Sequence, residues 1–357
     1  MKKTPSLGEV AQRAGVSAAT VSRIARGQLS VDAAIQARVR KAAAELGLDL
    51  DQRRNEASTI IAFLLSNRDV LHSFQARILV GAEAYCASQN MELLYMSFRY
   101  SPTVPPLALH LPRILGQRNL VRAVILGGTN SPNMLLALRE QKISFAVLGN
   151  NVIGDWIPEE FDTVYSDDVQ GASDLTSHLI AEGHRDIWFI GDLEFPWYAR
   201  CAEGYRRSML SAGLQPRFSE IQSGDRSLGY LATRSILSRQ EPVTAIFAGS
   251  DQIARGVYEA LEQAGLSVPD DISVAGFNDT EAALLHPPMT SVAEYPEELG
   301  RHLAGFVLKR AQEPDRVPQK LTIPTRVVVR QSTKPPKPRD PAAASPRVEE
   351  PPSVSPV

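Results

Sequence analysis

Residues 7–26, LGEVAQRAGVSAATVSRIAR, constrain the fold more than any other stretch because they predict two short helices joined by a tight turn. Apolar residues recur at helical spacing on both sides of Gly15, which suits a turn position with positive φ. Ser17 follows as a candidate N-cap of the second helix. The stretch therefore predicts a helix-turn-helix.

The second of these helices presents small side chains, hydroxyl groups and guanidinium groups on its outer surface. These residues are Ala18, Ala19, Thr20, Ser22, Arg23 and Arg26. Small side chains let a helix enter the major groove, hydroxyls bond phosphates, and arginine recognises the O6 and N7 edge of guanine. We expect this helix to dock on DNA; the alternative is an ordinary helical hairpin with a solvated face.

The charge distribution supports a nucleic-acid partner. The whole chain has a formal charge of -2, but residues 1–54 carry ten Lys or Arg and five Asp or Glu, a balance of +5 against -7 for the remainder. A basic segment attached to an acidic body is typical of a DNA-binding module joined to a domain that does not bind DNA.

Length and composition exclude several classes of protein. A chain of 357 residues holds two or three domains, and 43% hydrophobic with 22% charged residues is typical of globular proteins. Cys86 and Cys201 provide neither a disulfide framework nor a metal-ligand set, which favours a reducing compartment. No apolar run reaches membrane-spanning length and MKKTPSLGEV lacks a signal region, so we expect a cytoplasmic protein without metal or cofactor.

The chain divides into four parts. A third helix is predicted from Ala33 to Leu46, with Asp32 as its N-cap, and it completes a helix-turn-helix domain over residues 1–47. A polar linker over residues 48–59 follows. Residues 60–330 form the body, and residues 331–357, with eight prolines, are predicted to be a disordered tail.

The body alternates short apolar strands with amphipathic helices. The predicted strands are Ile60–Leu65, Leu93–Ser97, Ala123–Leu126, Phe145–Leu148, Thr163–Tyr165, Ile187–Ile190, Ala245–Ala248, Ser273–Phe277 and Arg326–Val329. The predicted helices include Gln75–Ser88, Gln170–Glu182, Arg200–Ala212, Leu228–Ser238 and Gln252–Ala264. This alternation predicts two α/β lobes, each a doubly wound parallel sheet, with a ligand at the carboxyl ends of the strands in the cleft between lobes.

The order of these parts resembles the LacI/GalR family of bacterial transcription regulators over roughly residues 6–333. The matching motifs are EVAQRAGVSAATVSR (9–23), AEGHRDIWFIG (181–191), ARCAEGYRRSM (199–209), AGSDQIARG (248–256), VPDDISVAGFNDTE (268–281) and PPMTSV (287–292). The resemblance implies a periplasmic-binding-protein-like body, a homodimer on a palindromic operator in double-stranded DNA, and a repressor controlled by a small ligand. One three-helix domain buries too little groove surface for useful specificity, which also favours a dimer.

The resemblance also assigns the DNA contacts. Base contacts fall to Ala18, Ala19 and Arg23, with most hydrogen-bonded recognition on the arginine. Backbone contacts fall to Ser6, Ser17, Thr20, Ser22 and Arg26. For Ser6 and Ser17, plain helix capping is the alternative.

The linker departs from the family pattern. Family members that bend DNA carry a Tyr-x-Pro-Asn segment and an Ala-Arg-x-Leu hinge helix whose leucine wedges into the minor groove. Here Leu48-Asp49-Leu50-Asp51 is followed by QRRNEAS, with no leucine at the wedge position. We therefore expect DNA binding without leucine intercalation and with backbone contacts from Arg53 and Arg54; solvated linker charges are the alternative.

The resemblance places the effector between the lobes. The candidate ligand contacts are His72, Phe74, Arg99, Asn150, Trp197, Arg200, Arg226, Ser250, Asp251 and Asn278. Asn278 replaces a frequent aspartate, and together with three arginines it favours a sugar acid or sugar phosphate over a neutral sugar. As alternatives, Arg200 pairs with a neighbouring acid, Arg226 points to solvent and Trp197 packs between lobes.

Other classes of function fit less well. His178 and His184 have no partner at metal-ligand spacing, so we expect structural roles for both. An enzyme is disfavoured because no Gly-rich phosphate loop follows the first strand and no G-x-S-x-G elbow is present. The basic N-terminal domain disfavours a periplasmic solute-binding protein, and a protein co-regulator remains a fourth possibility. Induction and co-repression both fit this architecture, as do a dimer and a tetramer.

Overall fold

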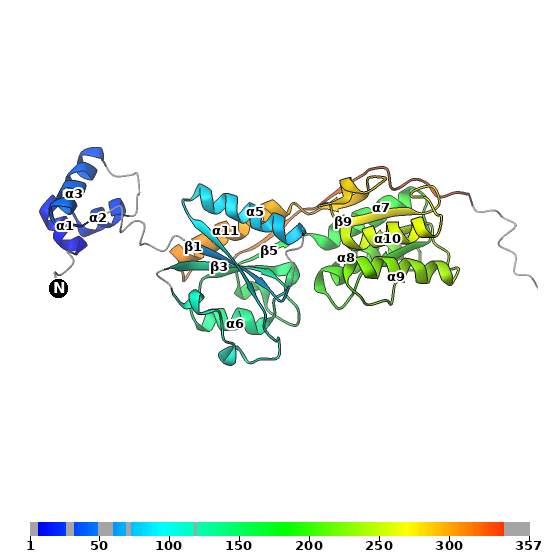
Figure 1. The fold of residues 1–357 in the computed structure, drawn as a ribbon, viewed down its shortest axis with the longest axis horizontal. Helices are drawn as coiled ribbons and strands as arrows, with labels where there is room; N and C mark the ends of the chain where they lie inside the picture. The colour runs from blue at the N-terminus through cyan, green and yellow to red at the C-terminus, as the bar shows by residue number, and fades with distance from the viewer. Residues whose placement is uncertain (1–5, 26–31, 49–59, 69–72, 118–119, 339–357) are drawn as a thin grey trace, which may run out of the picture. The chain divides into compact units, whose positions relative to one another are not determined.

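The computed structural model describes residues 6–25, 32–48, 60–68, 73–117 and 120–338 (Figure 1). The predictions for Arg26, Arg53, Arg54 and His72, for linker residues 49–59 and for tail residues 339–357 lie outside the described residues. Within the described part of the chain, no helix is long and apolar enough to span a bilayer.

Three short helices form the N-terminal domain. Their bounds are α1 (Leu7–Ala14), α2 (Ala18–Ala25) and α3 (Ala33–Glu45). Gly15 has φ 64° and ends α1 in the left-handed conformation, as the sequence predicted. Val10, Val21 and Val39, one from each helix, are fully buried against one another in a shared core. Helices of this length are marginal alone, so this core stabilises all three.

The rest of the chain divides into two compact units. Lobe 1 comprises residues 60–167, 195–197 and 294–324, and lobe 2 comprises residues 168–194, 198–293 and 325–338. The prediction of a two-lobed α/β body is confirmed, and each lobe is built around its own six-stranded sheet. Because the chain passes repeatedly between the lobes, neither lobe is a continuous segment.

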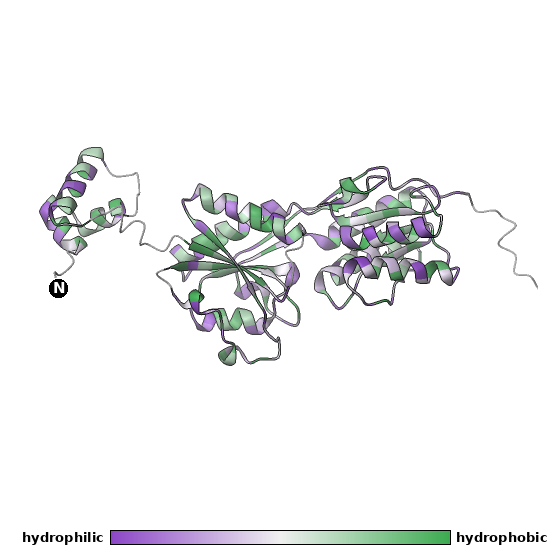
Figure 2. Cartoon of the chain, in the orientation of Figure 1, coloured by the Kyte–Doolittle hydropathy of each residue, from purple (hydrophilic) through white to green (hydrophobic). Residues whose placement is uncertain are grey.

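Lobe 1 has a parallel sheet in the order β11-β5-β4-β3-β1-β2. Its elements are β1 (Ile60–Ser66), α5 (Ser73–Ser88), β2 (Glu92–Phe98), β3 (Val121–Gly128), α6 (Pro132–Glu140), β4 (Phe145–Leu148), β5 (Thr163–Ser166), α11 (Pro296–Gln312) and β11 (Lys320–Ile323). On β1, Phe63 packs with α5 and α11 while Leu64 packs with α6 on the opposite face. The central strands of this sheet are therefore hydrophobic on both faces (Figure 2).

Lobe 2 has a sheet in the order β12-β10-β9-β8-β6-β7, with only the β10–β12 pair antiparallel. Its elements are α7 (Asp168–Ala181), β6 (Ile187–Ile190), α8 (Pro196–Ser211), β7 (Arg217–Phe218), α9 (Asp225–Ser238), β8 (Ala245–Ala248), α10 (Asp251–Gln263), β9 (Ser273–Asn278), β10 (Thr290–Ala293) and β12 (Arg326–Val328). The helices α7 and α8 pack around Phe189 and Phe247, whose rings meet edge to face at 5.2 Å. On the other side of this core, α10 contacts α9, β8 and β9.

In each lobe, one pair of helices crosses at a glycine on each helix. In lobe 1, a Cβ on Gly81 of α5 would lie 2.0 Å from the Glu297 carbonyl oxygen, and one on Gly300 of α11 would lie 2.0 Å from that of Ile78. Gly81 therefore lies over the carbonyl three residues before Gly300, and Gly300 lies over the carbonyl three residues before Gly81. Only glycine allows the two backbones to approach this closely.

The crossing in lobe 2 repeats this geometry. A Cβ on Gly229 of α9 would lie 2.0 Å from the Ile253 carbonyl oxygen, and one on Gly256 of α10 would lie 2.0 Å from that of Arg226. The same offset of three residues appears on both sides. The two lobes therefore use the same close packing of paired helices.

All nine strands predicted from the sequence are present, and β4, β6 and β8 have the predicted bounds. The strands β7, β10 and β11 were not predicted. Two residues are too few for β7 to show a pattern, and β11 alternates exposed with half-buried residues instead of forming an apolar run.

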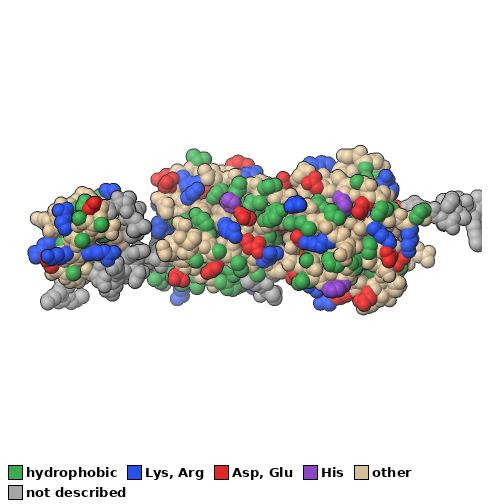
Figure 3. Space-filling model, turned by 90° about the horizontal axis from the view of Figure 1, so that it is seen from above, with side chains coloured by type: hydrophobic (Ala, Val, Ile, Leu, Met, Phe, Trp, Pro, Cys, Tyr) green, Lys and Arg blue, Asp and Glu red, His purple; other side chains and the backbone are tan. Residues whose placement is uncertain are grey.

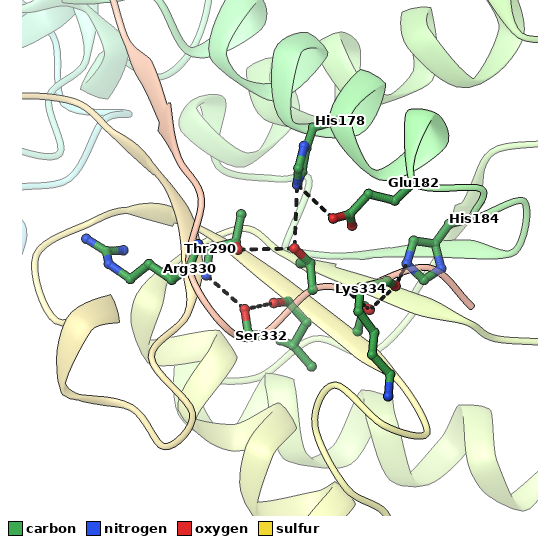
Figure 4. Close-up of polar contacts among 10 residues, drawn as sticks. His178, Glu182, His184, Thr290, Arg330, Ser332 and Lys334 are labelled. Carbon is green, nitrogen blue, oxygen red and sulfur yellow. Dashed lines mark hydrogen bonds and ion pairs between the residues drawn. The ribbon is translucent and has the colours of Figure 1, made fainter. Parts of the chain in front are cut away.

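The predicted start of the disordered tail at Gln331 is wrong for residues 331–338 (Figure 4). Ser332 is fully buried; its hydroxyl donates to the Val274 carbonyl and accepts from the Thr290 N–H at 2.8 Å. The Lys334 N–H donates to the Ser273 hydroxyl at 3.1 Å. Composition missed this segment because it is held by hydrogen bonds rather than by large apolar side chains.

Candidate DNA-binding and effector-binding sites

The outer surface of α2 has the composition that the sequence predicted. Val21 and Ile24 are buried in the domain core, whereas Ala18, Ala19 and Arg23 are exposed. Arg23 makes no ion pair with any other described residue, so its guanidinium is available to a partner. Lys and Arg side chains gather on the visible face of this domain (Figure 3). Two small residues and an arginine on the same exposed surface suit insertion into a groove.

The hydroxyl groups predicted to contact phosphates have partners inside the domain. Ser6 accepts from the Glu9 N–H at 3.3 Å, and its own N–H donates to the Glu9 carboxylate at 2.6 Å. Ser17 accepts from the Thr20 N–H at 3.1 Å and hydrogen bonds the Thr20 hydroxyl at 2.8 Å. The capping alternative for Ser6 and Ser17 is therefore confirmed, and their phosphate contacts stay predictions, as does that of Ser22.

In lobe 1, polar residues gather at the carboxyl edge of the sheet, where ligands of doubly wound folds bind. Asn150 lies two residues after the end of β4 and is 4% exposed. Its amide donates to the Ser166 carbonyl and accepts from the Ser166 N–H, both at 2.9 Å. These bonds hold the Asn150 side chain against the end of β5, and its contact with a ligand stays a prediction.

The other lobe 1 candidates occupy different environments. Phe74 packs against the core formed by α5 and α11. Arg99 is exposed directly after β2. The Trp197 ring stacks on Phe195 with centroids 4.8 Å apart, and the Arg68 guanidinium lies 4.7 Å from its centroid. Part of the Trp197 ring is thus already covered by protein groups.

In lobe 2, two of the predicted arginines are paired with acids. Arg200 of α8 lies 3.3 Å from Asp168 of α7, whose side chain is 2% exposed. Arg226 of α9 forms an ion pair with Glu259 of α10, and its side chain is 62% exposed. The structure therefore matches both alternatives that the sequence left open: Arg200 pairs with a neighbouring acid, and Arg226 faces solvent.

Ser250 and Asp251 lie at the start of α10, next to the turn that follows β9. The Ser250 hydroxyl accepts from the Ile253 N–H at 3.2 Å and from the Tyr198 hydroxyl at 3.3 Å. Asp251 accepts from the Thr280 N–H at 2.7 Å and from the Glu281 N–H at 2.8 Å. Burial raises the pKa of Asp251 to about 6. The hydrogen bonds of both side chains therefore stabilise the loops at the carboxyl edge of this sheet.

Asn278 and Asp279 have positive φ values of 93° and 53° at the end of β9. The Arg330 guanidinium lies 2.7 Å from the Asp279 carboxylate. Asp168 and Arg330 were not among the predicted site residues. The position of Asp168 three residues after the end of a predicted strand was a usable signal, whereas Arg330 gave none because it lies far along the chain.

His178 and His184 both have protein partners (Figure 4). His184 is 1% exposed and lies 3.0 Å from both the Thr244 hydroxyl and the Lys334 carbonyl oxygen. His178 lies 3.5 Å from both the Thr333 hydroxyl and Glu182. No group of three His, Cys, Asp or Glu side chains suited to a metal ion occurs in the described part of the chain. Both rings serve the packing of residues 331–338.

Comparisons with known proteins agree with this architecture. Residues 6–48 match the family model "Bacterial regulatory proteins, lacI family", and residues 176–333 match "Periplasmic binding protein-like domain". The HTH-type transcriptional regulator CelR of Thermobifida fusca is 29% identical over 343 residues, 93% of this chain and 99% of that protein. The ribose operon repressor of Escherichia coli K12 is 29% identical over 329 residues, 89% of this chain and 96% of that protein.

Solved structures give the same result. A CelR–cellobiose complex has a TM-score of 0.67 at 27% identity and covers 92% of this chain and 100% of that chain. The lac repressor dimer bound to operator has a TM-score of 0.68 at 24% identity, with 93% and 100% coverage, and supports the fold alone. A helix-turn-helix domain followed by this two-lobed body defines a DNA-binding transcription regulator rather than an enzyme. The chain belongs to the LacI family.

Proposed function

We propose that this protein is a homodimeric repressor that binds a palindromic operator and responds to a sugar bound at the carboxyl edges of its two sheets. The single observation that supports it most is the surface of α2, where Ala18, Ala19 and Arg23 are exposed together and Arg23 has no ion-pair partner among the described residues. Two such helices on a two-fold axis recognise two half-sites. In this proposal the three residues contact bases, Ser6, Ser17, Thr20, Ser22 and Arg26 contact the backbone, and Arg53 and Arg54 replace a leucine wedge.

For the effector, the contacts of the arginines favour a neutral sugar over a sugar acid. The acidic ligand was inferred from three arginines, but Arg200 is paired with Asp168 and Arg226 with Glu259. Because two of the three arginines have carboxylate partners, the number of arginines no longer favours an acidic ligand. Relatives point the same way, since a CelR structure holds cellobiose and a LacI-family regulator from Enterococcus faecium holds ribose.

The operator is tested by selecting DNA on the full-length protein and titrating the enriched duplexes at two salt concentrations. We expect an enriched palindrome with an affinity at least about a thousandfold above random DNA. Weak, steeply salt-dependent binding without a consensus would contradict the proposal, because it reports phosphate contacts alone. The central spacing of the palindrome also tests whether the atypical linker changes half-site geometry.

The effector is tested by calorimetry with matched pairs of ligands, such as glucose against glucuronate and ribose against ribose 5-phosphate. We expect a neutral sugar to bind more tightly than its acidic counterpart and to change operator affinity in a gel-shift titration. Asp168→Asn releases Arg200, and we expect it to move the preference toward the acidic ligand. Tighter binding of the acid by the unmodified protein would contradict a neutral effector.

A further inference from the structure

A cavity of about 440 Å³ opens at the amino edge of the lobe 1 sheet. It lies where β4 begins at Phe145 and where Asp162 precedes β5, and Pro314 and Pro318 after α11 form its outer wall. The carboxyl ends of the same strands, at Leu148 and Ser166, lie at the opposite edge of the sheet. The cavity is therefore separate from the effector residues of this lobe.

The floor of the cavity is apolar and rigid. Ile143, Phe145 and Phe161 line it, and each is at most 9% exposed. The two phenylalanine rings are 5.6 Å apart, which is within the normal range for a packed aromatic pair. The volume falls in the range of about 300–1,000 Å³ that is typical of small-molecule sites. A ring or a branched chain of a ligand would find a preformed surface here.

Cationic groups with unused hydrogen-bond donors surround this floor. Arg139 lies over the Phe161 ring at 5.4 Å and donates through Nη1 to Glu160 at 2.5 Å. Arg310 donates through Nε to Asp162 at 2.8 Å and through Nη1 to backbone carbonyls. Among the described residues, neither Nη2 group donates a hydrogen bond. Lys142 is exposed at the rim and makes no ion pair with any described residue.

The acids of the cavity leave these donors available. Both oxygens of Asp162 are used, one by Arg310 and the other by the Gln319 N–H at 2.8 Å. Glu160 is paired with Arg139. Asp315 lies exposed at the rim, where water screens its charge. Unused donors above an apolar floor require a ligand with acceptors at one end and an apolar body at the other.

We propose that this cavity is a second ligand site, which binds a small carboxylate carrying an aromatic ring or a branched apolar chain. The carboxylate accepts from Lys142 and from the free Nη2 groups of Arg139 and Arg310. The ring packs on Phe145 and Ile143. The site is independent of the sugar proposed above, because its residues come only from the amino edge of lobe 1.

The test is calorimetry of the full-length protein with 3-phenylpropanoate. We expect a Kd in about the millimolar range or tighter, as the size of this probe allows. The neutral amide 3-phenylpropanamide and the ringless propanoate should each bind at least about tenfold more weakly, since each lacks one half of the recognition. Absence of binding by 3-phenylpropanoate, or equal binding of the amide, would overturn the proposal.

Variants locate the probe. We expect Arg139→Gln combined with Lys142→Gln to weaken binding about tenfold or more, whereas Lys309→Gln, an exposed α11 lysine outside the cavity, leaves it unchanged. Ser144→Trp places an indole in the cavity and should abolish binding without lowering the melting temperature. Arg200→Gln in lobe 2 should leave probe affinity unchanged. Unchanged affinity in Ser144→Trp, or its loss in Arg200→Gln, would show that the probe binds elsewhere and refute the assignment.

Discussion

Replacing His184 with glutamine tests how the buried histidine of lobe 2 contributes to stability. Its ring is 1% exposed and lies 3.0 Å from the Thr244 hydroxyl and from the Lys334 carbonyl oxygen. Burial lowers the pKa of His184 from 6.5 to about 4, and the neighbouring His178 and Arg185 act in the same direction. The folded protein therefore holds the neutral ring at pH values where the unfolded chain is protonated.

The direction and size of the effect follow from these two pKa values. Because the pKa of the folded state is depressed, the contribution of His184 is complete above pH 6.5 and is lost as the pH falls toward 4. Between those values the unfolded chain binds more protons than the folded protein. The loss amounts to about 2 kcal/mol at pH 5 and about 3 kcal/mol at pH 4.

The assay is urea unfolding from pH 7 to pH 4.5, followed by the fluorescence of Trp188 in a Trp156→Phe, Trp197→Phe background. Trp188 lies in lobe 2, where its indole N–H donates to the Pro242 carbonyl at 3.1 Å. We expect His184→Gln to be less stable than the parent at pH 7 by about 1–3 kcal/mol, because buried hydrogen bonds are lost. The difference should shrink by about 2 kcal/mol at pH 5, since glutamine does not titrate.

The control is His286→Gln, which removes an exposed histidine of the same lobe. Carboxylates titrate in all three proteins, so their contribution cancels in the comparison. A difference between the parent and His184→Gln that is the same at pH 7 and pH 5 would refute the reasoning. It would mean that the ring does not change its proton affinity on folding.

Three further predictions concern other parts of the chain. Gly300→Ala should lower the free energy of unfolding in denaturant melts by about 1–3 kcal/mol, because its Cβ would lie 2.0 Å from the Ile78 carbonyl oxygen. Gly305→Ala, with no contact closer than 3.4 Å, should not lower it, and equal effects of the two substitutions would contradict the close helix crossing. Asp162→Asn should lower the free energy of unfolding in denaturant melts by about 2–3 kcal/mol, because it weakens a fully buried partner of Arg310. Glu160→Gln, in an exposed ion pair, should lower it by under about 1 kcal/mol, and a larger effect of Glu160→Gln would contradict this explanation. Arg23→Ala should weaken operator binding about tenfold to a hundredfold and random DNA far less; uniform weakening would assign Arg23 to phosphate rather than to bases.

The strands and helices were predictable where their residues are buried on both faces. The strands Phe145–Leu148, Ile187–Ile190 and Ala245–Ala248 are continuous apolar runs, and the structure reproduces their bounds. The exposed edge strand Lys320–Ile323 carries no such run, because only part of its surface is buried. The buried strand Thr290–Ala293 was missed as well, because its sequence TSVA is short and half polar. Hydrophobic patterning therefore finds strands made of continuous apolar residues and misses those that lack such a run.

The predicted start of the disordered C-terminal tail was wrong for a different reason. Residues 331–338 are rich in small and polar side chains, and composition alone predicted disorder. Ser332 is nevertheless fully buried, because its hydroxyl and backbone bond Val274 and Thr290. Hydrogen bonds to strands more than forty residues away leave no local pattern in the sequence. Such segments are visible only once the sheet they bind is known.

The charges of the effector site were also hard to predict from sequence, because they depend on partners far along the chain. From the sequence, each arginine counts as an available cation, and Arg200 and Arg226 therefore predicted an anionic ligand. The structure pairs both with acids that lie 32 and 33 residues away along the chain. At the amino edge of lobe 1, Arg139 and Arg310 each have a carboxylate partner, and their Nη2 groups donate to none of the other described residues. Anion binding depends on donors without partners rather than on the number of arginines, and the ligand proposed for this edge of lobe 1 rests on that difference.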